Sequence, residues 1–239
     1  MIGNIGNSTV IESHKVKLLG IDIDSDLKFE DHINSICRKA AKKLNALSRQ
    51  CNILAFHRRK TLMHAFFNSQ FSYCPLVWMF CSRKLNTKIN NLQYRALQII
   101  YRDDISTFHD LLHRDGSVTI HYRNVRLLAI EIFKVVKKLA PSIMSDIFVP
   151  NINTNIENVS SNTRSHSQFY NPANPKTTNY GLETLRYLGP KIWNILPDDL
   201  KNAASICIFK HMIKSWIPVK CPCRLCLDYI PNLGYLQAT

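Results

Sequence analysis

Hydrophobic residues recur every three or four positions through much of the chain, which is the spacing of one face of an α-helix. Within residues 31–51 the apolar positions are Ile33, Ile36, Cys37, Ala40, Leu44 and Leu47. The same spacing predicts helices over about 58–71, 85–101, 107–114, 120–139 and 203–216. The helix at 107–114 is expected to follow an N-cap at Ser106 and to stop at Gly116. The pattern therefore predicts a mainly α-helical protein.

Two segments depart from this helical pattern. Residues 15–23, KVKLLGIDI, are rich in branched apolar residues around Gly20, which favours two short strands or one bent strand. Residues 149–181 are rich in Asn and Ser and poor in large apolar residues, which is typical of a linker. We therefore expect a strand pair within 1–30, a basic helical bundle over 31–148, a flexible linker over 149–181 and a small helical module over 182–239.

Basic residues are concentrated in one part of the chain. The 239 residues carry a net charge of +14, and the segment from His32 to Arg102 holds thirteen Lys and Arg but no Asp or Glu. Helix surfaces usually mix both signs because like charges one turn apart repel, so this segment predicts an interface for nucleic acid, with an ordinary solvated face as the alternative. The residues expected to contact phosphates are Arg38, Lys39, Lys42, Lys43, Arg58, Arg59, Lys60, Lys84 and Lys88.

Several classes of protein do not fit this sequence. Gly116 is the only glycine between Ile21 and Tyr180, so no loop there has the glycines of a phosphate-binding fingerprint. The longest stretch without a formal charge is broken by His64, Asn68 and Pro75, which excludes a membrane span there. The start, MIGNIGNSTV, lacks the features of a secretion signal. We therefore expect a protein of the nucleus or cytoplasm with reduced cysteines and no membrane partner.

Two groups of residues are candidates for chemistry. Asp103 and Asp104 form an adjacent carboxylate pair of the kind that holds divalent ions, but they follow a helix, and a structural turn is the favoured interpretation. Cys221, Cys223 and Cys226 place three thiols within six residues, as in a zinc site. The fourth ligand is expected to be His211 or Cys207; the alternative is a small packed turn of reduced cysteines.

Other histidines, cysteines and aromatic residues are expected to have structural roles. We interpret His32, His64, His109, His113 and His121 as ordinary helix or cap residues. The cysteines at positions 37, 51, 74 and 81 lie on predicted apolar helix faces and are expected to belong to the core. The aromatic residues of the basic segment have helical spacing, so most are expected in the core, which leaves the phosphate backbone as the contacted part of a nucleic acid.

Long ordered blocks of the sequence resemble a known family. These are KLLGIDIDSDLKFEDHINSICRKAAKKLNAL, LMHAFFNSQFSYCPLVWMFCSRKLNTKINNLQYRALQIIY, IHYRNVRLLAIEIFKVV, LGPKIWNILPDDLK and CPCRLCLDYIPNLG. Together they are similar to the C-terminal part of reverse transcriptases from Jockey-like non-LTR retrotransposons. The resemblance spans about residues 15–236.

The resemblance implies that the chain is a fragment of an RNA-directed DNA polymerase that carries the thumb and the region after it. The KLLGI segment would then support the primer end, and the helices from Asp31 onward would form the thumb that contacts an RNA/DNA template–primer duplex. The family's catalytic F/Y-x-Asp-Asp box precedes this region, so magnesium belongs to the missing palm and no catalytic residue can be assigned here. The implied partners are the duplex and the missing palm and fingers.

Two other functions remain open at the level of sequence. One is a non-catalytic helical protein-interaction domain, or a decayed remnant of an element with no activity. The other is a metal-dependent nuclease that uses Asp103 and Asp104.

Overall fold

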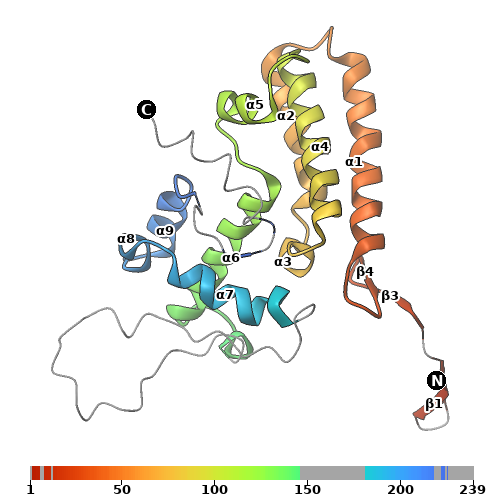
Figure 1. The fold of residues 1–239 in the computed structure, drawn as a ribbon, viewed down its shortest axis with the longest axis vertical. Helices are drawn as coiled ribbons and strands as arrows, with labels where there is room; N and C mark the ends of the chain where they lie inside the picture. Colours follow the sequence, from red (N-terminus) through yellow and green to blue (C-terminus); the bar gives the residue numbers. More distant parts are fainter. Residues whose placement is uncertain are drawn as a thin grey trace. The chain divides into compact units, whose positions relative to one another are not determined.

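The computed structural model describes residues 2–5, 8–11, 13–145 and 181–217, together with residues 222, 223 and 225. The described part is mainly α-helical, with antiparallel strand pairs at the N-terminus (Figure 1). This confirms the predicted fold class. The chain divides into two compact units, Met1–Ile120 and His121–Thr239. The predicted linker 149–181 lies outside the described residues except for its last residue.

Two short hairpins precede the helices. Strand β1 (Ile2–Ile5) pairs with β2 (Ser8–Ile11), a hairpin that the sequence pattern did not reveal. Strand β3 (Lys15–Leu18) pairs antiparallel with β4 (Ile21–Asp24), as expected. The turn between them places Leu19 at φ 47° and Gly20 at φ 83°. Positive φ at both central residues is the geometry of the tight hairpin turns that match the twist of the strands, so Gly20 marks a turn between two strands.

Contacts from the helical part hold this second hairpin in place. The Tyr73 hydroxyl donates a hydrogen bond to the carbonyl of Leu19. In β4, two residues after Gly20, the backbone N–H of Asp22 donates a hydrogen bond to Nδ1 of His32 at 3.3 Å. Burial lowers the pKa of His32 more than the nearby Asp22 carboxylate raises it, so the ring is neutral at pH 7 and acts as an acceptor.

Three long helices form the core of the first unit. They are α1 (Glu30–Gln50), α2 (Phe56–Phe66) and α4 (Arg83–Tyr101). Between α2 and α4 lie the 3₁₀ turn η1 (Asn68–Phe71) and the short helix α3 (Pro75–Trp78). Helices α1 and α4 run in the same direction, and α2, which lies between them in the sequence, runs in the opposite direction (Figure 1). Their buried side chains include Ile33, Ala40, Leu44, Phe67, Phe71, Ile89, Ala96, Leu97 and Ile100.

Helix α5 (Phe108–Asp115) completes the first unit against α4. Its N-cap is Thr107, whose hydroxyl accepts from the N–H of Asp110 while the Asp110 carboxylate accepts from the N–H of Thr107. The predicted cap at Ser106 is therefore wrong by one residue. Beyond α5, the buried amide of Gln93 accepts from Ile120 N–H at 3.0 Å and donates to Val118 O at 2.9 Å. This amide fixes the chain at the start of α6.

The second unit contains α6 (Ile120–Val136), the 3₁₀ turns η2 (Ser142–Met144) and η4 (Gly181–Glu183), and α7 (Leu185–Asn194), α8 (Asp198–Lys201) and α9 (Ile206–Met212). The rings of Phe133 and Phe209 stack with centroids 4.3 Å apart, and Trp193 stacks on Phe209 at 6.4 Å. All three side chains are fully buried. Helix α6 thus packs with the C-terminal helices, whereas the sequence analysis placed it in the basic bundle.

Among the described residues, no helix combines the length and the apolar character needed to cross a bilayer.

Candidate nucleic-acid interface

An open groove lies between α1 and α4 in the first unit. Its volume is about 1110 Å³, and α1 and α4 supply all of its lining residues. Four of these residues are basic: Arg38 from α1, and Lys84, Lys88 and Arg95 from α4. Most of the others are polar, namely Glu30, Asp31, Asn34, Ser35, Thr87 and Asn91. A polar, cationic groove of this kind suits an anionic ligand better than an apolar one.

The helical repeat explains why these side chains meet in one groove. On α4 the lining residues Lys84, Lys88 and Arg95 are spaced by four and seven positions, which places them on one face of the helix. This face lies beside the row that carries buried Leu85 and Ile89. The α4 cations consequently form a line along the groove.

Two of the groove cations are hydrogen-bonded across it to α1. Lys88 Nζ donates to Asn34 Oδ1 at 2.6 Å, and Arg95 Nη2 donates to Asn45 Oδ1 at 2.8 Å. From the first pair to the second, the partner on each helix lies further toward the C-terminus, as expected when α1 and α4 run parallel. Because Arg95 and Lys88 have neutral partners in these contacts, their positive charges are not neutralised.

Acidic residues stand only at the N-terminal end of the groove lining. Glu30 and Asp31 lie in the first turn of α1, where negative charge is favoured by the helix dipole. Asp31 forms an ion pair with Lys15 of β3, and its hydrogen bond raises the pKa of Lys15. The carboxylate of Asp31 is thus partly compensated by a cation from the hairpin.

Arg95 was missed by the sequence analysis. It lies seven residues after Lys88, so the helical repeat alone could have placed it in the same row.

The remaining predicted cations of α1 and α2 occupy different faces. Lys42 is exposed one turn after Arg38 and extends the basic edge of the groove. Lys39 is exposed on α1 directly after Arg38. Lys43 lies over the ring of Phe66, with Nζ 5.9 Å from the ring centroid. Arg58 is exposed near the start of α2. The groove residues are therefore Arg38, Lys84 and Lys88 of the predicted set.

Two of the predicted phosphate contacts, Arg59 and Lys60, have structural roles instead. Arg59 is buried, and its Nη1 donates to the carbonyls of Cys51 at 3.0 Å and Leu54 at 3.3 Å, just beyond the end of α1. Lys60 forms an ion pair with Asp115, whose carboxylate is almost fully buried, with Nζ and Oδ1 2.9 Å apart. Both cations are used inside the unit, so neither belongs to the proposed interface.

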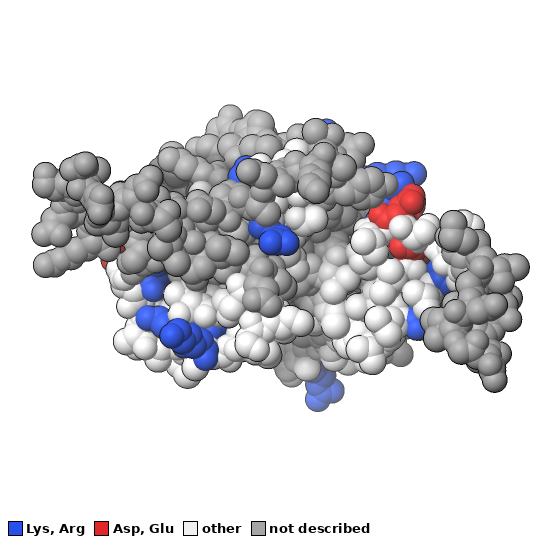
Figure 2. All heavy atoms as spheres, turned by 90° about the horizontal axis from the view of Figure 1, so that it is seen from below, with Lys and Arg blue, Asp and Glu red and all other residues white. Residues whose placement is uncertain are grey.

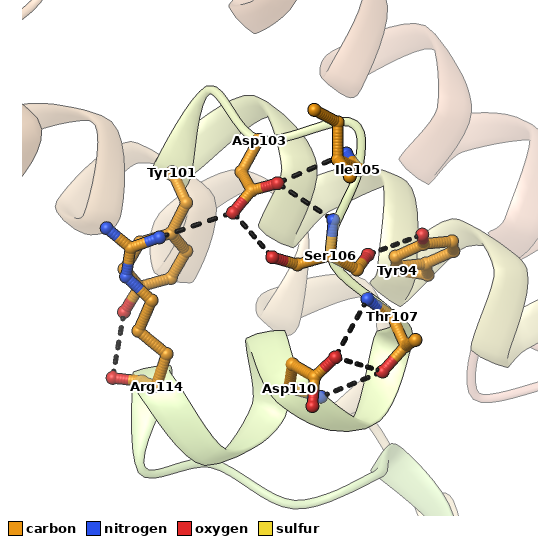
Figure 3. A network of polar contacts seen from close by, with 8 residues as sticks. All are labelled: Tyr94, Tyr101, Asp103, Ile105, Ser106, Thr107, Asp110 and Arg114. Atoms are coloured by element: carbon orange, nitrogen blue, oxygen red, sulfur yellow. Dashed lines mark hydrogen bonds and ion pairs between the residues drawn. The ribbon is translucent and has the colours of Figure 1, made fainter.

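The adjacent carboxylates at 103 and 104 lie in the loop between α4 and α5 (Figure 3). The Asp103 carboxylate accepts hydrogen bonds from the N–H groups of Ile105 at 3.1 Å and Ser106 at 2.9 Å, and from the Ser106 hydroxyl at 2.7 Å. It also pairs with Arg114 at 3.3 Å. These contacts, first of all those from Ser106, lower the pKa of Asp103. This arrangement is that of a structural turn, the favoured interpretation.

The cysteines of the first unit only partly follow the prediction of a core position. Cys37 and Cys81 are buried, whereas Cys51 is half-buried and Cys74 is exposed. Burial raises the pKa of the Cys37 thiol to about 11. The thiol of Cys37 is therefore protonated at pH 7. Cys74 departs from the prediction because it is the residue before α3 and so does not lie on a helix face.

The predicted cysteine cluster is described only at Cys223, because Cys221 and Cys226 lie outside the described residues. Cys223 is buried, with Sγ 3.2 Å from Nε2 of His121. The two residues that were expected to supply the fourth ligand, His211 and Cys207, are both exposed on α9. His121 had been interpreted as an ordinary helix residue. Within the described residues no three His, Cys, Asp or Glu side chains gather as a metal-binding group.

Figure 2 shows the charged side chains of the described residues on one face of the molecule. On the face drawn in Figure 2, Lys and Arg side chains stand at several separate places, while Asp and Glu side chains gather mainly in one. The specific feature is the groove between α1 and α4, where cations from two helices line a single space.

The chain matches no protein-family model, no curated protein and no solved structure.

Proposed function

We propose that the chain is a nucleic-acid-binding module without catalytic residues of its own, in which the α1–α4 groove contacts the phosphate backbone of a duplex. Following the family resemblance, the ligand would be an RNA/DNA template–primer duplex. The active centre, with its magnesium, would lie in a palm encoded outside these residues. On this proposal the chain is a fragment of a retrotransposon RNA-directed DNA polymerase.

One observation carries the proposal: four cations line one groove in a segment without acidic residues from His32 to Arg102, and no ion pair joins any of them to another described residue. Lys84 and Arg95 are eleven residues apart on α4, which corresponds to about 16 Å along the helix axis. Duplex DNA presents a phosphate about every 3.4 Å along each strand. A helix of this length that lies along the backbone can therefore bring its cations to successive phosphates.

The N-terminal hairpin supports a second part of the proposal, a contact with the missing palm and fingers. Four large apolar side chains are exposed on and beside it, with exposed fractions of 57% for Val16, 58% for Leu18, 81% for Leu19 and 63% for Leu27. Exposed apolar residues in such number favour a protein surface as neighbour. The resemblance places the palm directly before this hairpin in the parent protein.

Salt-dependent duplex binding tests the main proposal. A fluorescently labelled RNA/DNA hybrid is titrated with the full 239-residue chain at several salt concentrations from about 50 to 200 mM, and binding is followed by fluorescence anisotropy. If five to eight phosphates are contacted, the logarithm of the association constant falls with the logarithm of salt at a slope of roughly −4 to −7. A flat salt dependence would contradict duplex binding. Incorporation of nucleotides by the chain alone would contradict a module without catalytic residues.

An acidic protein ligand is the alternative for the same groove, since its cations would attract carboxylates as well as phosphates. Poly-glutamate of matched charge is therefore titrated in parallel. Preference for the hybrid supports the proposal. Equal or tighter binding of poly-glutamate supports a protein-interaction domain instead.

A further inference from the structure

The α1–α4 groove contains neutral polar side chains in addition to its cations. Helix α4 supplies Thr87 and Asn91, and α1 supplies Ser35. Thr87 and Asn91 are exposed, and Ser35 is half-buried. The structure gives none of these three side chains a hydrogen-bond partner among the described residues. Their hydroxyl and amide groups are therefore available to a ligand in the groove.

On α4 the neutral side chains alternate with the cations. Thr87 lies three residues after Lys84 and directly before Lys88. Asn91 lies three residues after Lys88 and four before Arg95. Positions three and four apart share one face of a helix, so these residues form a single row along the groove. A nucleic-acid strand likewise alternates phosphates with sugars, so a strand whose phosphates follow the cations brings its sugars to Thr87 and Asn91.

The chemistry of these neutral groups suits a sugar hydroxyl better than a phosphate. A phosphate diester only accepts hydrogen bonds, and the cations beside it already supply donors. A Thr hydroxyl and an Asn amide can each donate and accept, and so can the 2′-hydroxyl of a ribose. Deoxyribose has no 2′-hydroxyl, so RNA offers these side chains a contact that DNA does not.

The lining of the groove is less suited to unstacked bases. Proteins bind the bases of single strands largely by stacking them on aromatic side chains. None of the described residues that line the groove is aromatic. The sugar–phosphate backbone is therefore the part of a nucleic acid that fits this lining.

We propose that the groove prefers an RNA strand to a DNA strand, with Thr87 and Asn91 hydrogen-bonded to 2′-hydroxyl groups while the cations contact the phosphates. Ser35 supplies a third hydroxyl to the same groove from α1. This inference rests on the proposed function, because it assigns a strand preference to the same interface. In a template–primer hybrid, the strand bound in the groove would then be the RNA.

The direct test compares duplexes of one sequence that differ in the 2′ group. The full chain is titrated into a labelled RNA/DNA hybrid, the same hybrid with 2′-fluoro groups in its RNA strand, and the matching DNA duplex. The fluoro strand keeps the A-form geometry of RNA but has no 2′ donor, so it separates the hydroxyl from the shape of the helix. Loss of two neutral hydrogen bonds corresponds to about tenfold weaker binding, which we expect for the fluoro hybrid and at least for the DNA duplex.

Two substitutions assign the preference to residues of the groove. Thr87→Val and Asn91→Leu roughly keep the size of each side chain but remove its hydrogen-bonding groups. The double variant should bind the RNA/DNA hybrid about tenfold more weakly, bind the fluoro hybrid like the wild type and keep the wild-type salt slope. The matched control, Thr61→Val with Asn52→Leu, changes the same residue types at exposed positions outside the groove lining and should leave every affinity unchanged.

The outcomes separate this inference from the proposed function. Salt-dependent binding with equal affinity for the hydroxyl and fluoro hybrids would retain the interface but overturn the RNA preference. A double variant that keeps the wild-type preference, or that loses affinity equally for both hybrids, would also overturn it. If no duplex is bound in a salt-dependent manner, the proposed function itself fails, and the strand preference fails with it. Because the fluoro comparison uses the wild-type chain, it decides the question even if a variant does not fold.

Discussion

Replacing two lysines of the groove gives the sharpest test of the proposed interface. Lys84 and Lys88 lie one turn apart on α4, and both line the groove. The double variant Lys84→Gln and Lys88→Gln removes two charges but keeps polar side chains at two positions on the surface of the groove. We therefore expect the fold to tolerate the change and duplex binding to weaken.

The size of the effect follows from counterion release. Each lost phosphate contact makes the slope of log affinity against log salt shallower by about 0.9, so the double variant should be shallower by about 1.8. If these contacts contribute nothing near 1 M salt, the loss at about 0.1 M is roughly 60-fold, or about 2.5 kcal/mol. The affinities of the variant and the wild type should therefore converge as salt is raised.

A charge-matched control separates local contacts from net charge. Lys210 and Lys214 are also exposed and four residues apart, but they lie in the second unit, at and just after α9. Neither lysine lines the groove, so Lys210→Gln with Lys214→Gln should leave the slope unchanged. The reasoning is refuted if both double variants lose affinity equally, or if the groove variant retains the wild-type slope in anisotropy titrations.

Two further predictions concern residues with structural roles. Arg59→Met should lower the free energy of unfolding in urea by about 2–3 kcal/mol, because the carbonyls of Cys51 and Leu54 lose a charged donor. The matched change at the exposed neighbour, Arg58→Met, should alter this free energy by no more than about 0.5 kcal/mol. Equal effects of the two substitutions would contradict the structural role of Arg59. The lowered pKa of Asp103 means that its contribution to stability is present above its unfolded pKa of about 3.9 and is lost as the pH falls through the folded value. Asp103→Asn should therefore melt at a lower temperature at neutral pH and lose less stability on acidification, whereas an unchanged acid sensitivity in thermal melts would be the contrary result.

Helix positions could be predicted from the sequence because they depend on local periodicity. The apolar spacing around Ile33 and Leu44 placed α1 to within one residue at each end. The N-cap of α5 was missed because Ser106 and Thr107 are both capable of capping. The choice is made by Asp110, which stands three residues after Thr107 and completes the reciprocal capping pair.

The residues of the candidate nucleic-acid interface are brought together by tertiary contacts, which local sequence patterns do not reveal. Whether a basic residue faces solvent or a buried partner is decided by packing, so Arg59 and Lys60 could not be told from Arg58 by spacing alone. The packing of α1 against α4 places Arg38 in the same groove as the α4 cations, which are more than 40 residues away in the sequence and therefore beyond the reach of any local pattern. The contact of His121 with Cys223 could not be predicted for the same reason, because the two residues are 102 positions apart in the chain.

The amide oxygens of Asn34 and Asn45 have a consequence for how a polyanion would enter the groove. In the free protein these amide oxygens accept hydrogen bonds from the Lys88 ammonium and the Arg95 guanidinium, so both long side chains are already restrained before any ligand binds in the groove. A phosphate oxygen would replace an amide oxygen as acceptor at little further cost in rotamer entropy. Because one hydrogen bond is exchanged for another, we expect calorimetry to find a small binding enthalpy, with association driven mainly by the entropy of displaced ions.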